Sequence, residues 1–524
     1  MKKIVKSILI VFAFTLFCAC SKEQLDVSNP NDPTFDAIES ESGITQLATG
    51  TYNTATFGVA WGFYWVVNAY HEAMGDAIYI PWGNFGFRWT NQPTSITLDD
   101  GTVVTPPQEG AQGEALEVRN VRTQTTGNAF AWEWESMYRV NNTSNLLLSL
   151  LDGTEFSGDA DLKKAVFRSW GYYWKGYAYS RIGSMYTAGL ILDEPGTTTG
   201  NYVSNTEILA EAKRNLDLAK AELEQISGSI TNVTSNIIPD NLVPSPFRGS
   251  SPSTVLTRDA WIRNINTLLA RNLLVNKKVS DMTTADWTQI TTLTNEGIQP
   301  SDFVFVMKQD GNNFEISTNV NTRFAFGWHF LSERLVQDFK TGDQRYDDNV
   351  QVLGSAEVNR AGRGIQYGTR FGLIENADYS ITENNKANIY FAGTYSENEL
   401  MKAEALIFSS QTDAGLALID GIRDHQQAAL PATSGTGLNM DEALEELRVE
   451  RRIGLFLRGV TFYDARRWDI TKTPRSGLSV LDGLGNVNTN ATFNYNYLDY
   501  WSVPDQELEF NEPNEGSVPV VSPN

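Results

Sequence analysis

The chain has 524 residues and a formal net charge of −22, because 63 Asp and Glu outnumber 41 Lys and Arg. This acidic balance disfavours nucleic acid and anionic lipid surfaces as partners. The only cysteines, Cys18 and Cys20, lie near the N-terminus, so we expect no disulfide, cysteine-based zinc site or thiol nucleophile in the body of the chain. The three histidines are scattered, and we expect no metal site and no cofactor.

The first 19 residues have the pattern of a signal peptide. Three lysines precede an apolar run, Ile8–Phe17, that is too short to cross a bilayer core of roughly 30 Å. Alanine directly before Cys20 is typical of a lipoprotein cleavage site, which favours Cys20 over Cys18 as the lipidated residue. Residues 20–35 are then a lipidated polar tether, and loss of the leader lysines changes the charge from −22 to −25. An ordinary secretory signal is the alternative.

Apolar side chains recur at helical spacing along much of the chain. Ser204 and Glu207 form a predicted capping box, Ser396 and Glu399 form another, and Asp441 is a predicted cap. The predicted apolar stripes are Val166, Trp170, Tyr173 and Tyr177; Ile208, Ala212, Leu216, Ala219 and Leu223; Ile262, Ile265, Leu269 and Leu273; Trp287, Ile290 and Leu293; Leu400, Ala403 and Ile407; and Leu444, Leu447 and Leu455. Paired helices rich in alanine and aromatic residues are typical of tetratricopeptide-like packing, here without a regular repeat.

Long irregular insertions separate the predicted helix pairs, and in a helical scaffold such insertions carry function. They are 183–203, 227–257, 299–395 and 471–498. Glycine, threonine and proline are frequent in residues 82–127, which we predict to be loop or short strand. Residues 301–390 contain short β-branched and aromatic runs such as Phe303–Val306, which favour a small sheet.

The segment Glu446–Trp468, ELRVERRIGLFLRGVTFYDARRW, resembles the C-terminal signature of the SusD/RagB family of Bacteroidetes outer-membrane lipoproteins. The matching residues are Glu450, Arg451, Arg452, Leu455, Gly459, Phe462, Tyr463, Asp464, Arg467 and Trp468. Four positions depart from the family's pattern: Gly454 and Arg458 stand in place of glutamates, Thr461 in place of arginine and Ala465 in place of leucine.

Further segments resemble the family in the same order along the chain. After the signal and Cys20 come LDVSNPND, the early helix of Trp134, Tyr138, Asn142 and Asn145, the pair Asp343 and Arg345, the helix of Glu404, and the closing motif of Pro504, Glu507 and Asn511. The usual N-P-G-Y ending of the family is missing. This colinearity over nearly the whole chain identifies it as a divergent member.

The resemblance implies a mostly α, SusD-like fold, in which four tetratricopeptide-like helix pairs carry long loop insertions and minor β structure. It implies one domain over residues 36–524, with an N-terminal part at about 36–230 and a C-terminal part at about 258–524. It also implies a lipid-anchored protein of the outer membrane at the cell surface. There it would bind an oligosaccharide, or an oligopeptide as the alternative, and deliver it to a SusC-like TonB-dependent transporter.

The signature residues are predicted to be structural rather than catalytic. On a helix, their charges are expected to form a network that fixes geometry. They are Glu450, Arg451, Arg452, Asp464, Arg467 and Trp468.

Candidate ligand-binding residues are aromatic side chains in predicted loops, because flat rings bind the CH faces of sugars. Trp82, Phe85 and Trp89, with Phe87 between them, cluster among glycines, where an exposed apolar patch favours a binding surface; local packing is the alternative. The neighbouring Asp76 and Asn91 are candidate hydroxyl partners. A second candidate group is Trp328 and Tyr367. The helical Trp170, Tyr173 and Trp174 are instead predicted to be core.

An enzyme is disfavoured. Carboxylate pairs of the kind glycosidases use arise by chance in so acidic a chain, and no motif singles one out. The sequence contains no G-x-S-x-G, H-E-x-x-H or phosphate-binding loop pattern. A helical-repeat adaptor with the transporter as its only partner is the third hypothesis.

Overall fold

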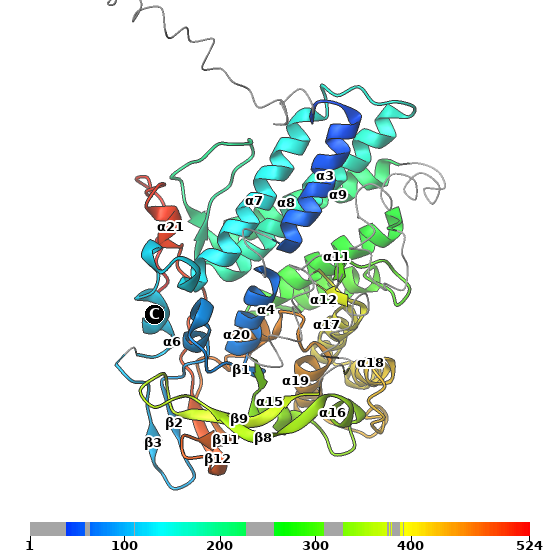
Figure 1. Cartoon of the computed structure of the whole chain (residues 1–524). Coiled ribbons are helices and arrows are strands. Elements are labelled where there is room, and N and C mark those ends of the chain that lie inside the picture. The colour runs from blue at the N-terminus through cyan, green and yellow to red at the C-terminus, as the bar shows by residue number, and fades with distance from the viewer. Residues whose placement is uncertain are drawn as a thin grey trace, which may run out of the picture.

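The computed structural model describes residues 38–57, 63–108, 110–226, 256–308, 329–374, 377, 379, 388–390 and 392–523. Within these residues, helices form most of the molecule, and a sheet closes it at the bottom of Figure 1. The predicted signal peptide, Cys20 and the tether lie outside the described residues, as do most of the insertion at 227–257 and the candidate Trp328.

Long helices of the described chain pack in four successive pairs, which confirms the predicted mostly helical scaffold of paired helices. The pairs are α3 (Glu41–Phe57) with α7 (Ala129–Leu150), α8 (Ala160–Met185) with α9 (Asn205–Gln225), α11 (Arg258–Val275) with α12 (Thr284–Asn295), and α17 (Tyr395–Phe408) with α18 (Thr412–His425). A further helix, α19 (Met440–Gly454), packs on α17 and α18. Two shorter helices, α4 (Phe63–Met74) and α20 (Thr461–Arg467), contact each other at the centre.

Local sequence explains where the second pair begins and which face it buries. The side chain of Asp159 accepts a hydrogen bond from the Leu162 amide and caps α8. The predicted apolar stripe of α8 is fully buried, because side chains at this helical spacing lie on one face and that face packs on the core. The predicted capping box of Ser204 and Glu207 is present at the start of α9.

Two predicted caps are wrong by two residues. Helix α17 is capped by Thr394, whose hydroxyl accepts from the Glu397 amide, and not by Ser396. Helix α19 is capped by Asn439 in a capping box with Glu442, and not by Asp441. In both places the backbone is extended at the observed cap and already helical at the predicted one, so only the former can accept from the first free amides.

The main sheet has eight strands drawn from distant parts of the chain, and they pair in antiparallel fashion. In order, the strands are β1 (Ile78–Tyr79), β7 (Phe330–Leu331), β9 (Tyr367–Leu373), β11 (Arg475–Asp482), β12 (Val487–Asn494), β2 (Ser95–Thr97) and β3 (Val103–Val104), with β8 (Val350–Val358) also paired to β9. The segment 471–498, predicted to be an irregular insertion, instead forms the β-hairpin of β11 and β12. Of the run Phe303–Val306, only Val306 belongs to a strand, β6 (Val306–Lys308), paired with β10 (Asn388–Tyr390).

Short helices join the long helices to the sheet. They are η2 (Asn84–Gly86), α5 (Phe87–Thr90), α6 (Gln112–Glu117), η3 (Arg122–Gly127), α15 (Glu333–Asp338), α16 (Gln344–Asn349) and α21 (Asp505–Leu508). The large core runs from α3 to Val503, and a second apolar cluster lies between α17, α18 and α19. Trp170, Tyr173 and Trp174 are buried in the large core, as predicted.

Candidate functional site

The loop after β1 carries the aromatic residues expected from the sequence to bind ligand. It contains η2 and α5 where loop or short strand was predicted. Gly86 has a φ of 78°, and a Cβ atom on it would lie 2.9 Å from the carbonyl oxygen of Gly127. Because glycine tolerates this left-handed conformation and has no Cβ, the loop can pack directly against η3.

Three of the four loop aromatics are half-buried, whereas Phe87 is fully buried. The guanidinium of Arg119 lies 3.5 Å from the centre of the Trp89 ring, a cation–π contact that holds the indole in place. Trp82 and Phe85 pack on the edge of the large core. We call the half-buried side chains of Trp82, Phe85 and Trp89 the aromatic ledge.

Three other sequence candidates lie inside the protein. The carboxylate of buried Asp76 accepts hydrogen bonds from Arg334 at 2.6 and 3.0 Å and from the Tyr495 hydroxyl at 2.6 Å. Burial opposes its charge, but Arg334 keeps the pKa of Asp76 below its ordinary value. The hydroxyl of buried Tyr367 donates to the carbonyl of Asn91, also buried, at 2.8 Å. The structure thus corrects their expected surface position: partners far away in sequence hold them in the core.

The signature helices contain a first buried ion network. Arg451 donates to the two carboxylate oxygens of Asp464 at 2.9 and 3.0 Å. Arg467 donates to Asp464 at 2.8 Å and to the two oxygens of Glu404, on α17, at 2.5 and 2.7 Å. The two arginines hold the pKa of Asp464 below its ordinary value even though burial opposes its charge. The network ties α17, α19 and α20 together.

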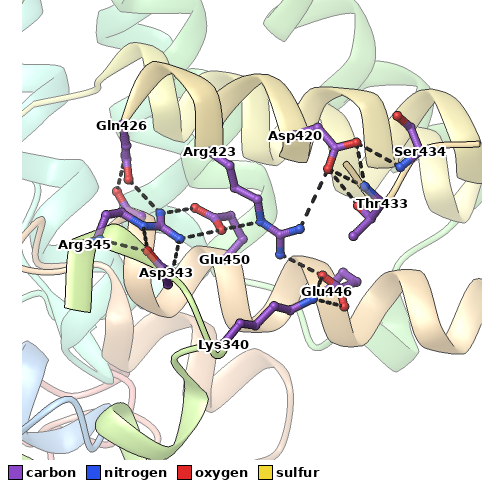
Figure 2. A network of polar contacts seen from close by, with 11 residues as sticks. Lys340, Asp343, Arg345, Asp420, Arg423, Gln426, Thr433, Ser434, Glu446 and Glu450 are labelled. Atoms are coloured by element: carbon purple, nitrogen blue, oxygen red, sulfur yellow. Dashed lines mark hydrogen bonds and ion pairs between the residues drawn. The ribbon is translucent and has the colours of Figure 1, made fainter. Parts of the chain in front are cut away.

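A second network surrounds Glu450 (Figure 2). Its carboxylate accepts from Arg345 at 2.6 and 3.2 Å and from Arg423 at 2.9 Å. Arg345 also donates to Asp343, so the D-x-R pair joins α16 to α19. Arg423 reaches on to Glu446 at 2.7 Å and thereby links α18 to the same helix.

The remaining signature residues also make internal contacts. Arg452 donates to the carbonyl oxygens of Gly75 and Asp76 at 2.7 and 3.1 Å and pairs with Asp338 at 2.6 Å. Trp468 is half-buried on the second apolar cluster, with the Arg467 guanidinium 5.3 Å from its ring centre. These side chains connect helices to each other and to the sheet.

A cavity that the sequence did not predict lies beside the second network. It has a volume of about 290 Å³, and its lining comes from α16, α18, α19, the start of α17 and residues 298–304. Gly454 and Arg458 both line it. These are two of the four positions that depart from the family's signature, so the departures were the available sequence signal.

Among the described residues, no group of three or more His, Cys, Asp or Glu side chains is placed to hold a metal ion. No helix in this part of the chain is both long enough and apolar enough to cross a bilayer.

Comparison with known proteins decides the family. No curated protein matches the sequence. The family model described as the SusD family matches residues 295–518, which include the D-x-R pair, the signature and the closing motif. Residues 295–518 thus belong to the SusD family.

Solved structures show the SusD-like fold over nearly all of this chain. A SusD-like protein from Bacteroides fragilis NCTC 9343 has a TM-score of 0.55 at 14% identity and covers 92% of this chain and 98% of its own. A SusD-like carbohydrate binding protein from Bacteroides vulgatus ATCC 8482 has a TM-score of 0.56 at 14% identity, covering 91% and 97%. A structure with xylogluco-oligosaccharide has a TM-score of 0.58 at 14% identity, covering 92% and 100%.

Proposed function

We propose that this SusD-family protein is a cell-surface lipoprotein that captures an oligosaccharide and delivers it to a SusC-like TonB-dependent transporter in the outer membrane. Acylation of Cys20 would hold the folded body at the membrane, because two or three acyl chains anchor stably where one does not. The observation that carries the proposal is the combination of the SusD-like fold with the aromatic ledge. The fold is shared with a protein named as carbohydrate binding and with one whose structure contains xylogluco-oligosaccharide.

The aromatic ledge is the proposed contact surface for the glycan. Half-buried indole and phenyl rings offer apolar faces to the CH groups of a sugar and lose little entropy on binding, because packing already orders them. Trp89 is braced by Arg119, and the Phe85 ring lies 5.5 Å from the Trp132 ring. The ledge is therefore a preorganised surface rather than a mobile loop tip.

Binding on such a shallow surface is expected to be weak. Millimolar to micromolar dissociation constants correspond to about −4 to −8 kcal/mol. Weak capture suffices beside a transporter, since tethering both partners to one membrane raises the effective concentration of the bound sugar.

Calorimetric titration with neutral oligosaccharides, including xylogluco-oligosaccharides, tests the ledge. We expect Trp82→Ala and Trp89→Ala each to weaken binding about five- to thirtyfold, as stacking on one ring is worth roughly 1–2 kcal/mol. Leu484→Ala, at an exposed turn of the β11–β12 hairpin, is the matched control and should bind like the wild type. Unchanged affinity in both tryptophan variants would remove the ledge, and binding of oligopeptides alone would favour the alternative ligand class.

The proposed role involves no chemical conversion of the ligand. The buried carboxylates of the signature are engaged by arginines, so they are not placed as an acid and a nucleophile around a substrate. Incubation of the purified protein with the same oligosaccharides should leave them intact. Release of shorter sugars at a rate that scales with protein concentration would contradict a purely binding role.

A further inference from the structure

The cavity beside the second ion network is separate from the aromatic ledge and shares no lining residue with it. Its volume of about 290 Å³ is at the lower end of small-molecule sites and is too small for a long oligosaccharide. It is built mainly from the ends of helices.

The floor is held by the network of Figure 2. Arg345 pairs with Asp343 and Glu450 and donates to the Gln426 side-chain oxygen at 3.0 Å. The Gln426 amide in turn donates to the carbonyl of Gly454 at 2.9 Å. Each floor group is therefore held by hydrogen bonds or ion pairs to its neighbours.

Gly454 keeps this floor open. A Cβ atom at this position would lie 2.7 Å from a Glu450 carboxylate oxygen and 3.3 Å from the Gln426 side-chain oxygen. Any side chain here would displace the network or fill the cavity. The glutamate of the family's pattern is thus replaced, at this position, by the one residue that leaves space.

Aromatic side chains form the walls. The rings of Tyr379 and Phe456 lie 5.5 Å apart, and those of Tyr395 and His425 are edge-to-face at 5.3 Å. These rings present apolar surface next to the polar floor. A site with ring faces and hydrogen-bonding groups side by side matches the two faces of a sugar ring.

Two polar groups of the lining, the Tyr379 hydroxyl and the Arg458 guanidinium, have no hydrogen-bond or ion-pair partner in the described part of the chain. The Tyr379 hydroxyl is buried without a hydrogen bond, and it remains a donor because burial raises its pKa to about 12. The guanidinium of Arg458 lies 4.4 Å from the Tyr390 ring centre and makes no ion pair there, although the chain carries a net charge of −22. A buried polar group without a partner costs free energy that a ligand can recover.

The surrounding charge argues against an acidic ligand. The network of Figure 2 has three cationic side chains, Lys340, Arg345 and Arg423, and four carboxylates, Asp343, Asp420, Glu446 and Glu450. Asp348 adds another carboxylate to the cavity lining. Arg458 therefore serves as a hydrogen-bond donor in a site whose field is not positive.

We propose that this cavity binds a single neutral pyranose unit, with Tyr379 and Arg458 donating to its hydroxyl groups and Tyr395 and Phe456 facing its CH groups. The inference rests on the proposed function for the ligand class, sugar, and adds a second site with its own specificity. It gives the protein a means to sense a free monosaccharide while an oligosaccharide occupies the ledge.

Saturation-transfer NMR on the purified protein tests the proposal, with D-glucose, D-galactose, D-mannose, D-xylose and D-glucuronate as probes. We expect at least one neutral sugar to give signal, and Tyr379→Phe and Arg458→Met each to weaken its binding at least fivefold. Trp89→Ala should keep this binding while losing that of oligosaccharides, which separates failure of the cavity from failure of the ledge. Circular dichroism and melting curves verify that each variant is folded.

Three results would overturn the cavity site. The first is absence of signal from every neutral sugar with folded wild-type protein. The second is equal binding by wild type, Tyr379→Phe and Arg458→Met. The third is binding of D-glucuronate alone, which would show recognition of a carboxylate instead of a neutral ring.

Discussion

At the scale of single residues, Glu72 is a buried carboxyl group whose pKa lies well above its ordinary value. It is fully buried on α4 and accepts from the Thr461 hydroxyl at 2.7 Å and the Gly459 amide at 3.1 Å, without an ion pair in the described chain. Thr461 stands where the family's pattern has arginine, so it gives Glu72 a hydrogen bond in place of an ion pair, and the charge of Arg452 offsets the burial of Glu72 only in part. Burial accordingly raises the pKa of Glu72 from 4.5 to about 7.

This pKa makes stability depend on pH in a defined direction. The folded state keeps the Glu72 proton up to about pH 7, whereas the unfolded state releases it near 4.5. The protonated Glu72 side chain thus makes its full contribution to the free energy of unfolding below pH 4.5. This contribution, about 3 kcal/mol in total, is lost as the pH rises through 7. We expect Glu72→Gln to remove this pH dependence of the free energy of unfolding. The stability of the variant relative to the wild type should therefore increase between pH 5 and pH 8.

Urea unfolding of both proteins at pH 5, 6.5 and 8 measures the effect. Glu404→Gln is a useful comparison, because it removes a carboxylate that has an arginine partner and should destabilise at all three pH values. Parallel pH profiles for wild type and Glu72→Gln would show that Glu72 titrates normally.

At the scale of elements, helix caps decide where the scaffold helices begin. Ser396 is the cap that the sequence predicts for α17, but Thr394 is the residue that accepts from a free backbone amide. The Glu397 side chain is unavailable for a capping box, since it pairs with Arg271 on α11. The start of α17 is therefore set jointly by a local cap and by a contact with the preceding helix pair.

Substitution at these positions separates the two caps. We expect Thr394→Ala to lower the free energy of unfolding by about 1 kcal/mol, the usual cost of losing a cap. Ser396→Ala should cost less, roughly 0.5 kcal/mol or below, because its hydroxyl only accepts one bond, from Gln426 at 3.2 Å. Urea midpoints at pH 7 give the comparison, and a larger loss for Ser396→Ala would contradict the assignment.

At the scale of the whole molecule, the ion networks connect parts that the chain order separates. The signature on α19 and α20 pairs with α16, α17 and α18, and Arg452 joins it to the turn between α4 and β1. The helix pairs and the sheet are thereby held in one arrangement. This arrangement places the aromatic ledge and the cavity on rigid elements, which favours binding by preorganised surfaces.

The attachment of the whole protein to the membrane is predicted to depend on one atom, the sulfur of Cys20. We expect Cys20→Ser to abolish incorporation of a labelled fatty acid and to move the protein from the membrane fraction to the soluble fraction. Cys18→Ser is the matched control and should remain labelled and membrane-bound. Label in the Cys20→Ser protein would place the lipid on another residue.

Local patterns were enough to predict much of the scaffold. The stripe Val166, Trp170, Tyr173 and Tyr177 and the capping box of Ser204 and Glu207 act within a few residues, so their structural meaning is contained in the sequence around them. The signature was recognisable for the same reason, because its residues lie on two consecutive helices. The order of helices and the family followed from these local signals.

Only the tertiary structure decided which candidate side chains are accessible. Asp76 and its partner Arg334 are 258 residues apart in the sequence, and Tyr367 donates to the distant Asn91. The residues that neighbour these side chains in the sequence therefore do not reveal that they are buried. The cavity is likewise formed by residues from 298 to 458 that meet only when α16, α17, α18 and α19 are packed. Periodicity and capping are short-range properties, whereas burial, ion pairing and empty space depend on which distant surfaces come together.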